Sequence, residues 1–331
     1  MKPQYLPLLT GFFLPLLSVH AETFKGRIER FDPAFDQLVA TNAKIEKLAE
    51  GFTWAEGPVW FDGAVIFSDV PANTAYRWKE GMTKAEVFLK PSGLLTPTAG
   101  FREPGSNGLA RDAQGRLLLC QHGERRVARY ADGKFTAIAD HFEGKRFNSP
   151  NDLAVRKNGE IYFTDPPYGL EGVDQSPRKE MPWHGVYRVT TDGVVTLLTK
   201  TMVYPNGIAF SPDEKTLYVG STENGNAHIE AFDVKADGTL ANERMFFDAR
   251  PLSKPELPGS CDGMKIDRDG NIWTSGPGGI LVITPAGKMI GRLNTGVPAA
   301  NCNWGDDGST LYITANHFLL RVKTTTKGNG W

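Results

Sequence analysis

One recurring segment restricts the fold of this chain more than any other feature. Three stretches align without a gap, each with an Asn or Asp at its second residue and a Gly eight residues later: SNGLARDAQGRLLLC from Ser106, PNDLAVRKNGEIYFT from Pro150 and CDGMKIDRDGNIWTS from Cys261. Three looser copies are PNGIAFSPDEKTLYVG from Pro205, AEGPVWFDGAVIFSD from Ala55 and ANCNWGDDGSTLYIT from Ala300. Apolar runs on both sides of a Gly turn indicate a β-hairpin. We therefore expect six related hairpins.

We use the term slot for the polar position near the start of each copy. The slot residues are Glu56, Asn107, Asn151, Asn206, Asp262 and, where the pattern is lost, Ala300. Successive slots lie between 38 and 56 residues apart. A constant hairpin with irregular spacing is typical of β-propeller blades, which have about 40–50 residues and accept insertions in their loops.

Further strands lie where the outer half of each blade is expected, and most of them flank an Asp-Gly or Ala-Gly turn, which favours hairpins. The sixth copy is followed by only one strand, while AKIEKLAEG stands as a spare strand before Glu56. We therefore predict an all-β, single-domain, six-bladed β-propeller over residues 43–331. Residues 43–50 would close the ring by pairing with blade six, which removes two open edges. A β-sandwich or a two-domain all-β protein is the alternative, but neither explains the repeated slot.

The N-terminus has the pattern of a secretory signal. MKPQYLPLLTGFFLPLLSVHAET contains one Lys, an apolar stretch from Leu6 to Leu17, and small residues at cleavage spacing. This stretch is short for a membrane span, so an anchor is the less favoured alternative. We expect residues 1–21 to be removed and the protein to be periplasmic or secreted. Residues 22–42 would form an extension in which FDPAFDQLVA predicts a short helix packed outside the propeller.

Charge and cysteine content narrow the possible partners. The formal charge is −1, from 37 basic and 38 acidic residues, which argues against nucleic acid or an anionic membrane as a partner. The three cysteines, Cys120, Cys261 and Cys302, allow at most one disulfide within the chain. We expect free, buried thiols instead.

In a propeller the innermost strands all begin on one face and line a central channel, so equivalent positions converge. The five polar slot residues would supply two carboxylates and three amide oxygens, without His or Cys. Oxygen-only donors favour Ca²⁺ on ligand type alone, and Mg²⁺, Mn²⁺ and Zn²⁺ remain open alternatives. The competing interpretation is that Asn-Gly and Asp-Gly are ordinary turn pairs.

Four of these motifs resemble one family. Glu56 in EGPVW, Asn151 in SPNDL, Asn206 in YPNGIAFSPD and Asp262 in CDGMKID are similar to signatures of the gluconolactonase, senescence-marker-protein and luciferin-regenerating-enzyme family of six-bladed propellers. The resemblance implies one divalent cation held by those four residues, hydrolysis of a lactone, and a place for Asn107 near the substrate. It does not require a ligand from Ala300.

For the chemistry, the resemblance favours Asp262 as the general base for attacking water, with Glu56 as the second candidate. Cation binding lowers the basicity of a carboxylate, and this conflict eases if one Asp262 oxygen faces water. Loop positions make His122, Tyr168 and His317 candidates for hydrogen bonds to the hydroxyls of a sugar-like substrate, with an ordinary surface or packing role as the alternative. Arg146, in KRFNSPND, would either bind a substrate or product carboxylate by a forked contact or form a salt bridge to a neighbouring blade. Trp183, in the insertion after Tyr168, would either stack on a sugar or anchor its own loop.

Three functions remain open at this point. The first is a calcium-dependent lactonase acting on an aldonolactone such as glucono-1,5-lactone. The second is hydrolysis of phosphotriesters or fluorophosphates by a similar centre, and the third is a ligand-binding propeller with structural calcium.

Overall fold

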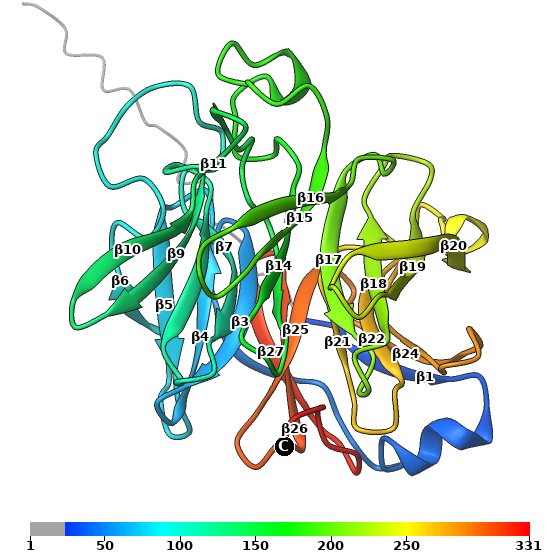
Figure 1. Cartoon of the computed structure of the whole chain (residues 1–331). Coiled ribbons are helices and arrows are strands. Elements are labelled where there is room, and N and C mark those ends of the chain that lie inside the picture. The colour runs from blue at the N-terminus through cyan, green and yellow to red at the C-terminus, as the bar shows by residue number, and fades with distance from the viewer. Residues whose placement is uncertain (1–23) are drawn as a thin grey trace, which may run out of the picture.

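The sheets of the fold follow the repeat. The structure is a computed structural model that describes residues 24–331, so the predicted signal segment 1–21 lies outside the described residues. Each copy of the repeat forms the two innermost strands of an antiparallel sheet, and the six sheets surround a common centre (Figure 1). The predicted six-bladed β-propeller is confirmed.

From the centre outward, the strands of the first three blades are β3 (Ala55–Phe61), β4 (Ala64–Asp69), β5 (Thr74–Trp78) and β6 (Glu86–Leu89); β7 (Ser106–Arg111), β8 (Leu117–Gln121), β9 (Arg126–Ala131) and β10 (Lys134–Ala139); and β13 (Leu153–Val155), β14 (Ile161–Asp165), β15 (Gly185–Val189) and β16 (Val195–Thr199). The strands of the last three blades are β17 (Pro205–Phe210), β18 (Thr216–Ser221), β19 (His228–Val234) and β20 (Leu240–Asp248); β21 (Met264–Ile266), β22 (Ile272–Gly276), β23 (Gly279–Ile283) and β24 (Met289–Asn294); and β25 (Ala299–Gly305), β26 (Thr310–Ala315) and β27 (Phe318–Lys323). Besides two N-terminal strands, described next, residues 24–331 contain a small hairpin and three 3-10 helices: β11 (His141–Phe142), β12 (Lys145–Arg146), η1 (Pro33–Gln37), η2 (Val173–Gln175) and η3 (Arg250–Leu252).

The ring closes through the N-terminal part of the chain. Strand β2 (Glu46–Glu50) is the outermost strand of blade six and pairs antiparallel with β27, from Glu46 opposite Arg321 to Glu50 opposite Phe318. The inner strands β25 and β3, from the last blade and the first, also pack against each other. The predicted closure by residues 43–50 is therefore confirmed.

The N-terminal extension contains a strand that the sequence analysis did not predict. Strand β1 (Arg27–Arg30) pairs with β24 and gives blade five a fifth strand, seen in Figure 1 as the blue segment beside β24. The 3-10 helix η1 follows, begun by Asp32, whose carboxylate accepts from the Ala34 amide at 2.8 Å. Its Phe35 is fully buried and lies 6.5 Å from Trp273, centroid to centroid. The extension therefore covers the outer part of the core.

The apolar core lies between neighbouring blades, not in the channel. One cluster joins Phe35 to blades five and six through Trp273 and Trp304, whose rings meet edge to face at 5.2 Å. All three cysteines are free and fully buried, as expected. No helix in residues 24–331 combines the length and the apolar composition needed to cross a bilayer.

The residue after the slot explains how the inner strands approach one another. It is Gly in four copies, whereas blades three and six have Asp152 and Asn301. A Cβ on Gly207 would lie 2.0 Å from the Asp262 carbonyl oxygen, although Gly207 does not have a positive φ. Glycine is needed there because backbone of the next blade occupies the space. The interpretation of these pairs as ordinary turns is therefore wrong for Asn206-Gly207, which lies inside a strand.

Candidate metal and substrate site

A cavity of about 290 Å³ opens at the end of the channel where the inner strands begin. All five polar slot residues line it, and each comes from a different blade: Glu56, Asn107, Asn151, Asn206 and Asp262. The remaining lining comes from loops and strand ends: Trp54, Arg102, Glu103, Tyr168, Thr222, Gly259, Ser260, Pro298 and Ala299. Its volume suits a small molecule such as a sugar, not a macromolecule.

Four oxygen atoms of this cavity are buried without a hydrogen-bond donor in the described chain. They are Oδ1 of Asn107, Asn151, Asn206 and Asp262. Buried polar atoms in native proteins almost always have a partner, because leaving one unsatisfied costs about 1–3 kcal/mol. Unsatisfied acceptors gathered around one cavity therefore fit a bound cation, which would satisfy those that it contacts.

Three carboxylates line the cavity: Glu103 is paired with Arg102, whereas Glu56 and Asp262 repel each other and are poorly solvated. Burial, followed by the negative charge of Asp152, raises the pKa of Glu56 to about 8. Burial and the charge of Glu56 raise the pKa of Asp262 well above its usual range, and a hydrogen bond from the Asn206 side chain opposes this. Asp262 nevertheless remains partly exposed to the cavity. A bound cation would remove this repulsion, which is a second reason why the residues fit one.

The donor types indicate which cations fit. In residues 24–331, no group of three or more His, Cys, Asp or Glu side chains is arranged to hold a metal ion. A cation in this cavity must therefore use asparagine oxygens as well as the two carboxylates. Such a donor set favours a hard cation, Ca²⁺ above Zn²⁺.

Polar and aromatic side chains form the rim above these oxygens. Tyr168 and Thr222 hydrogen-bond to each other through their hydroxyls, and the Tyr168 ring stacks on Tyr204 at 5.2 Å. Burial raises the pKa of Tyr168, so its hydroxyl stays protonated at neutral pH. Arg102 forms an ion pair with Glu103 beside them. This rim offers hydrogen-bond donors and acceptors to the hydroxyl groups of a ligand.

His122, predicted to contact substrate, is fully buried and does not line the cavity. It lies behind Glu103, with 3.9 Å between its Nδ1 and the Glu103 Oε2. Burial lowers its pKa to about 3, so the ring is neutral at physiological pH.

Three other predicted contacts also lie outside the lining. Arg146 stands in β12, and its guanidinium donates to the Glu124 carbonyl oxygen. His317 packs its ring against Phe318 at 4.0 Å. Trp183 donates to the Tyr187 hydroxyl at 2.9 Å, so it anchors its own loop. Of the predicted substrate contacts, Asn107 and Tyr168 alone line the cavity.

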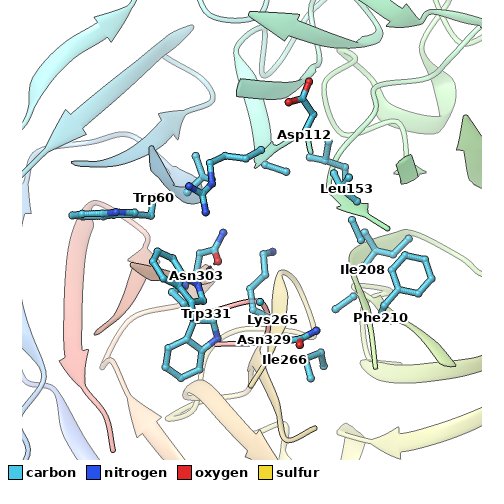
Figure 2. A pocket seen from close by; sticks show the side chains of 18 of the residues that line it. Trp60, Asp112, Leu153, Ile208, Phe210, Lys265, Ile266, Asn303, Asn329 and Trp331 are labelled. Carbon is cyan, nitrogen blue, oxygen red and sulfur yellow. Dashed lines mark hydrogen bonds between the residues drawn. The ribbon is translucent and has the colours of Figure 1, made fainter. Parts of the chain in front are cut away.

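A larger cavity of about 510 Å³ occupies the opposite end of the channel (Figure 2). Its walls come from later positions of the same inner strands, among them Leu153, Ile208 and Phe210, and the C-terminal Trp331 lies at one side. None of the slot residues lines it. The chemistry of the slots is therefore confined to the smaller cavity.

Residues 54–317 match the SMP-30/gluconolactonase/LRE-like region family. The chain belongs to this family. It is 39% identical over 312 residues to a gluconolactonase of Zymomonas mobilis, which covers 92% of this chain and 87% of that protein. A gluconolactonase structure from Xanthomonas campestris is 33% identical, with a TM-score of 0.77 over 90% of this chain and 95% of that one. A calcium-binding regucalcin from Agrobacterium tumefaciens shares the fold, with 20% identity and a TM-score of 0.64 over 87% of this chain and 96% of that one.

Within this family fold, sequence reasoning missed Asn301, a fully buried residue that contacts the site. Its Nδ2 lies 3.2 Å from Glu56 Oε2 and 3.3 Å from Asp152 Oδ2. The sixth copy has Ala300 in the slot, but the next residue reaches the channel instead. The available signal was the position after the slot, where four copies have Gly and the two polar exceptions, Asp152 and Asn301, contact each other.

Proposed function

We propose that this protein hydrolyses an aldonolactone such as glucono-1,5-lactone to its aldonic acid, with one divalent cation held by Glu56, Asn151, Asn206 and Asp262. The observation that carries the cation is the unsatisfied buried oxygens of Asn151, Asn206 and Asp262, which line the same cavity as the Glu56 carboxylate. Lactone hydrolysis itself is supported by the 39% identity to a gluconolactonase over 92% of the chain.

Calcium is the cation we propose. Ca²⁺ accepts carboxylate and amide oxygens in flexible geometry, whereas Zn²⁺ prefers nitrogen or sulfur. The calcium-binding regucalcin that shares the fold supports this choice. Two carboxylates, Glu56 and Asp262, balance a divalent charge.

When bound, such a cation would polarise the lactone carbonyl and stabilise the negative charge that develops on its oxygen. Asp262 faces the cavity and would accept a proton from the attacking water. The water oxygen bonds to the carbonyl carbon, the ring carbon–oxygen bond breaks, and the proton passes to the ring oxygen as it leaves. The product is the open hydroxy acid.

The rim would orient the substrate. The hydroxyls of Tyr168 and Thr222 are within the cavity lining and can bond sugar hydroxyls. Asn107, the fifth polar slot residue, contributes a further unsatisfied oxygen to the same cavity. We propose that Asn107 and Tyr168 position the ring so that the carbonyl meets the four proposed ligands.

The decisive experiment follows acid release from glucono-1,5-lactone in a pH-stat, with the purified protein before and after chelation. We expect chelation to abolish hydrolysis while the circular dichroism spectrum persists, and added CaCl2 to restore it better than ZnCl2. Asp262→Asn should reduce kcat by about 10²–10⁴-fold. Asp269→Asn, an exposed Asp in a turn of the same blade, should match the wild type. Hydrolysis of paraoxon in place of the lactone, or lactone binding without opening, would refute the proposal.

A further inference from the structure

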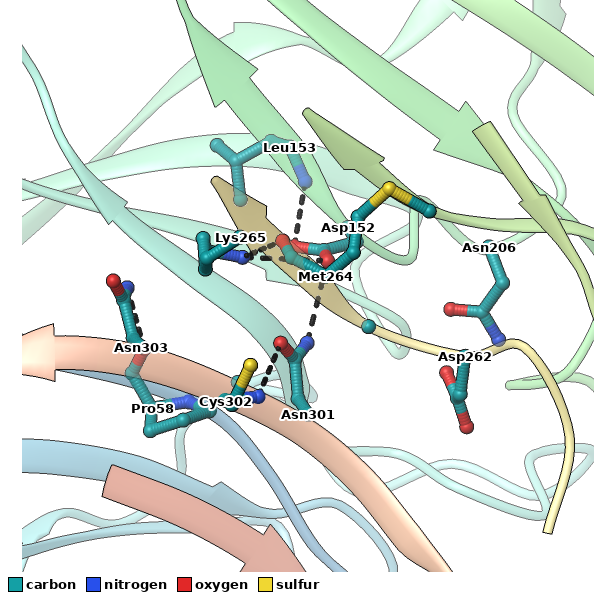
Figure 3. A network of polar contacts seen from close by, with 12 residues as sticks. Pro58, Asp152, Leu153, Asn206, Asp262, Met264, Lys265, Asn301, Cys302 and Asn303 are labelled. Atoms are coloured by element: carbon teal, nitrogen blue, oxygen red, sulfur yellow. Dashed lines mark hydrogen bonds and ion pairs between the residues drawn. The ribbon is translucent and has the colours of Figure 1, made fainter. Parts of the chain in front are cut away.

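Directly beneath the cavity lies a second layer of side chains that the proposed mechanism does not use. The residues after the slots form this layer, and the four glycines leave its centre open. Asp152 from blade three and Asn301 from blade six fill the space and meet there (Figure 3). Each is only 1% exposed.

The orientation of the Asn301 amide is fixed by its own backbone. Its Oδ1 accepts from the Cys302 amide at 2.9 Å. A backbone N–H can only donate, so the oxygen must face Cys302 and the Nδ2 must face the channel. The Nδ2 then donates to Glu56 Oε2 and to Asp152 Oδ2. Asn301 therefore links a proposed cation ligand to a second buried carboxylate.

The two oxygens of Glu56 have different surroundings. Oε2 accepts from the Gly57 amide at 2.7 Å and from Asn301 at 3.2 Å. No hydrogen-bond donor in residues 24–331 reaches Oε1. Two donors on one oxygen restrict the rotation of the carboxylate, so Oε1 is the oxygen left for a ligand in the cavity.

Asp152, at the other end of this link, has its negative charge balanced by Lys265. Asp152 Oδ1 accepts from the Leu153 amide at 2.8 Å, and the Lys265 Nζ lies 3.8 Å from Asp152 Oδ2. Lys265 enters from the opposite cavity and also donates to the Met264 carbonyl oxygen at 2.9 Å. Because Lys265 neutralises Asp152 and Arg102 pairs with Glu103, the unbalanced charges beside the proposed cation site are those of Glu56 and Asp262. This leaves two negative charges, which match one divalent cation.

We propose that Asn301, anchored by the Asp152–Lys265 ion pair, is a positioning residue that holds Glu56 Oε2 and presents Oε1 to the cation. This inference rests on the proposed cation site and adds to it a role for three residues that contact neither cation nor substrate.

The chain offers a matched control two residues along the same strand. Asn303 also accepts from the amide of the next residue, Trp304, at 2.9 Å. Its Nδ2, however, donates at 2.8 Å to the Pro58 carbonyl oxygen and not to Glu56 or Asp152. Asn303→Leu therefore removes two side-chain hydrogen bonds on the same strand, against the three that Asn301→Leu removes, without touching Glu56.

The test measures binding of Ca²⁺ alone, as CaCl2, to the chelator-treated protein by calorimetry, beside kcat and KM for the lactone. We expect Asn301→Leu to weaken Ca²⁺ binding by about 10–100-fold, the usual loss when a partner of a ligand is removed. Asn303→Leu should change Ca²⁺ binding less than about threefold. KM measured at saturating Ca²⁺ should change little in either variant.

A second pair of variants tests the anchor even if Asn301→Leu fails to fold. Asp152→Asn leaves the Lys265 ammonium unpaired near the proposed cation site. Its positive charge should weaken Ca²⁺ binding by repulsion. Adding Lys265→Met to Asp152→Asn removes that charge and should recover part of the affinity. Equal Ca²⁺ affinity in wild type and Asn301→Leu, or in Asp152→Asn and the double variant, would overturn the positioning role alone. Absence of Ca²⁺ binding by the wild type would overturn the proposed cation and this role together.

Discussion

Replacing Gly263 with alanine would place a methyl group where the Asn301 side chain now lies. A Cβ at residue 263 would stand 1.9 Å from Asn301 Cγ and 2.2 Å from both its Nδ2 and its Oδ1. Ordinary carbon contacts are about 3.5–4.0 Å, so the amide must retreat by roughly 1.5 Å. Its bonds to Glu56 and Asp152 are already 3.2 and 3.3 Å long, so both would break. Gly263 has no positive φ, so the backbone itself accepts alanine.

The expected cost has two sources. Overpacking a dense interior costs about 1–3 kcal/mol. Each broken hydrogen bond to a charged group costs about 1.5–3 kcal/mol, and part of this returns when the side chain relaxes. We therefore expect Gly263→Ala to lower the free energy of unfolding in urea by about 2–5 kcal/mol.

A double-mutant cycle separates this explanation from a general disturbance of blade five. Asn301→Ala removes the atoms that the new methyl group meets, so Gly263→Ala should cost at least about 1 kcal/mol less in that background. Ca²⁺ affinity should stay low in the double variant, because the hydrogen bond from Asn301 to Glu56 Oε2 is absent. Additive free energies of unfolding, within about 0.5 kcal/mol, would refute the proposed contact.

Three further predictions test other parts of the structure. Tyr168→Phe should raise KM for the lactone about 2–10-fold with Ca²⁺ affinity unchanged, because it removes one hydroxyl from the rim. An unchanged KM would exclude Tyr168 from substrate contact. Phe35→Ala should lower the free energy of unfolding by about 3–5 kcal/mol in urea, since its ring is fully buried against Trp273. A loss below about 1 kcal/mol would mean that the extension does not pack against Trp273. Burial lowers the pKa of His122 from 6.5 to about 3, so the unfolded chain binds the extra proton and stability is lost as the pH falls between these values. His122→Gln should reduce the slope of unfolding free energy against pH in that window, and identical slopes would contradict the burial argument.

The fold could be predicted because its signal is local and repeated. Alternating apolar residues around a Gly turn specify a hairpin wherever they occur, and six copies leave few architectures other than a propeller. Ring closure followed from counting strands, because one spare strand stood at the start and one place was open in blade six. Strand β1 was missed because Arg27–Arg30 contains one apolar residue, Ile28, and its partner β24 lies far along the chain.

The site was partly predictable for the same reason. Equivalent positions of a closed ring meet at its axis, so five polar slots had to share one cavity. His122 was chosen from loop position and Arg146 from its place before the SPND motif, and neither fixes the direction of a side chain. His122 turns into the packed layer behind Glu103, and Arg146 turns toward the Glu124 carbonyl oxygen.

The sequence by itself determined the blades, their number and the register of the slots, because hairpin formation depends on residues close together in the chain. The tertiary structure decided which side chains fill the channel centre. Asn301 gains its role only because Gly263 leaves space beside it and Asp152 arrives from the opposite blade. Contacts between residues 149 positions apart have no local signature, since burial and charge act at that point only after the ring has closed.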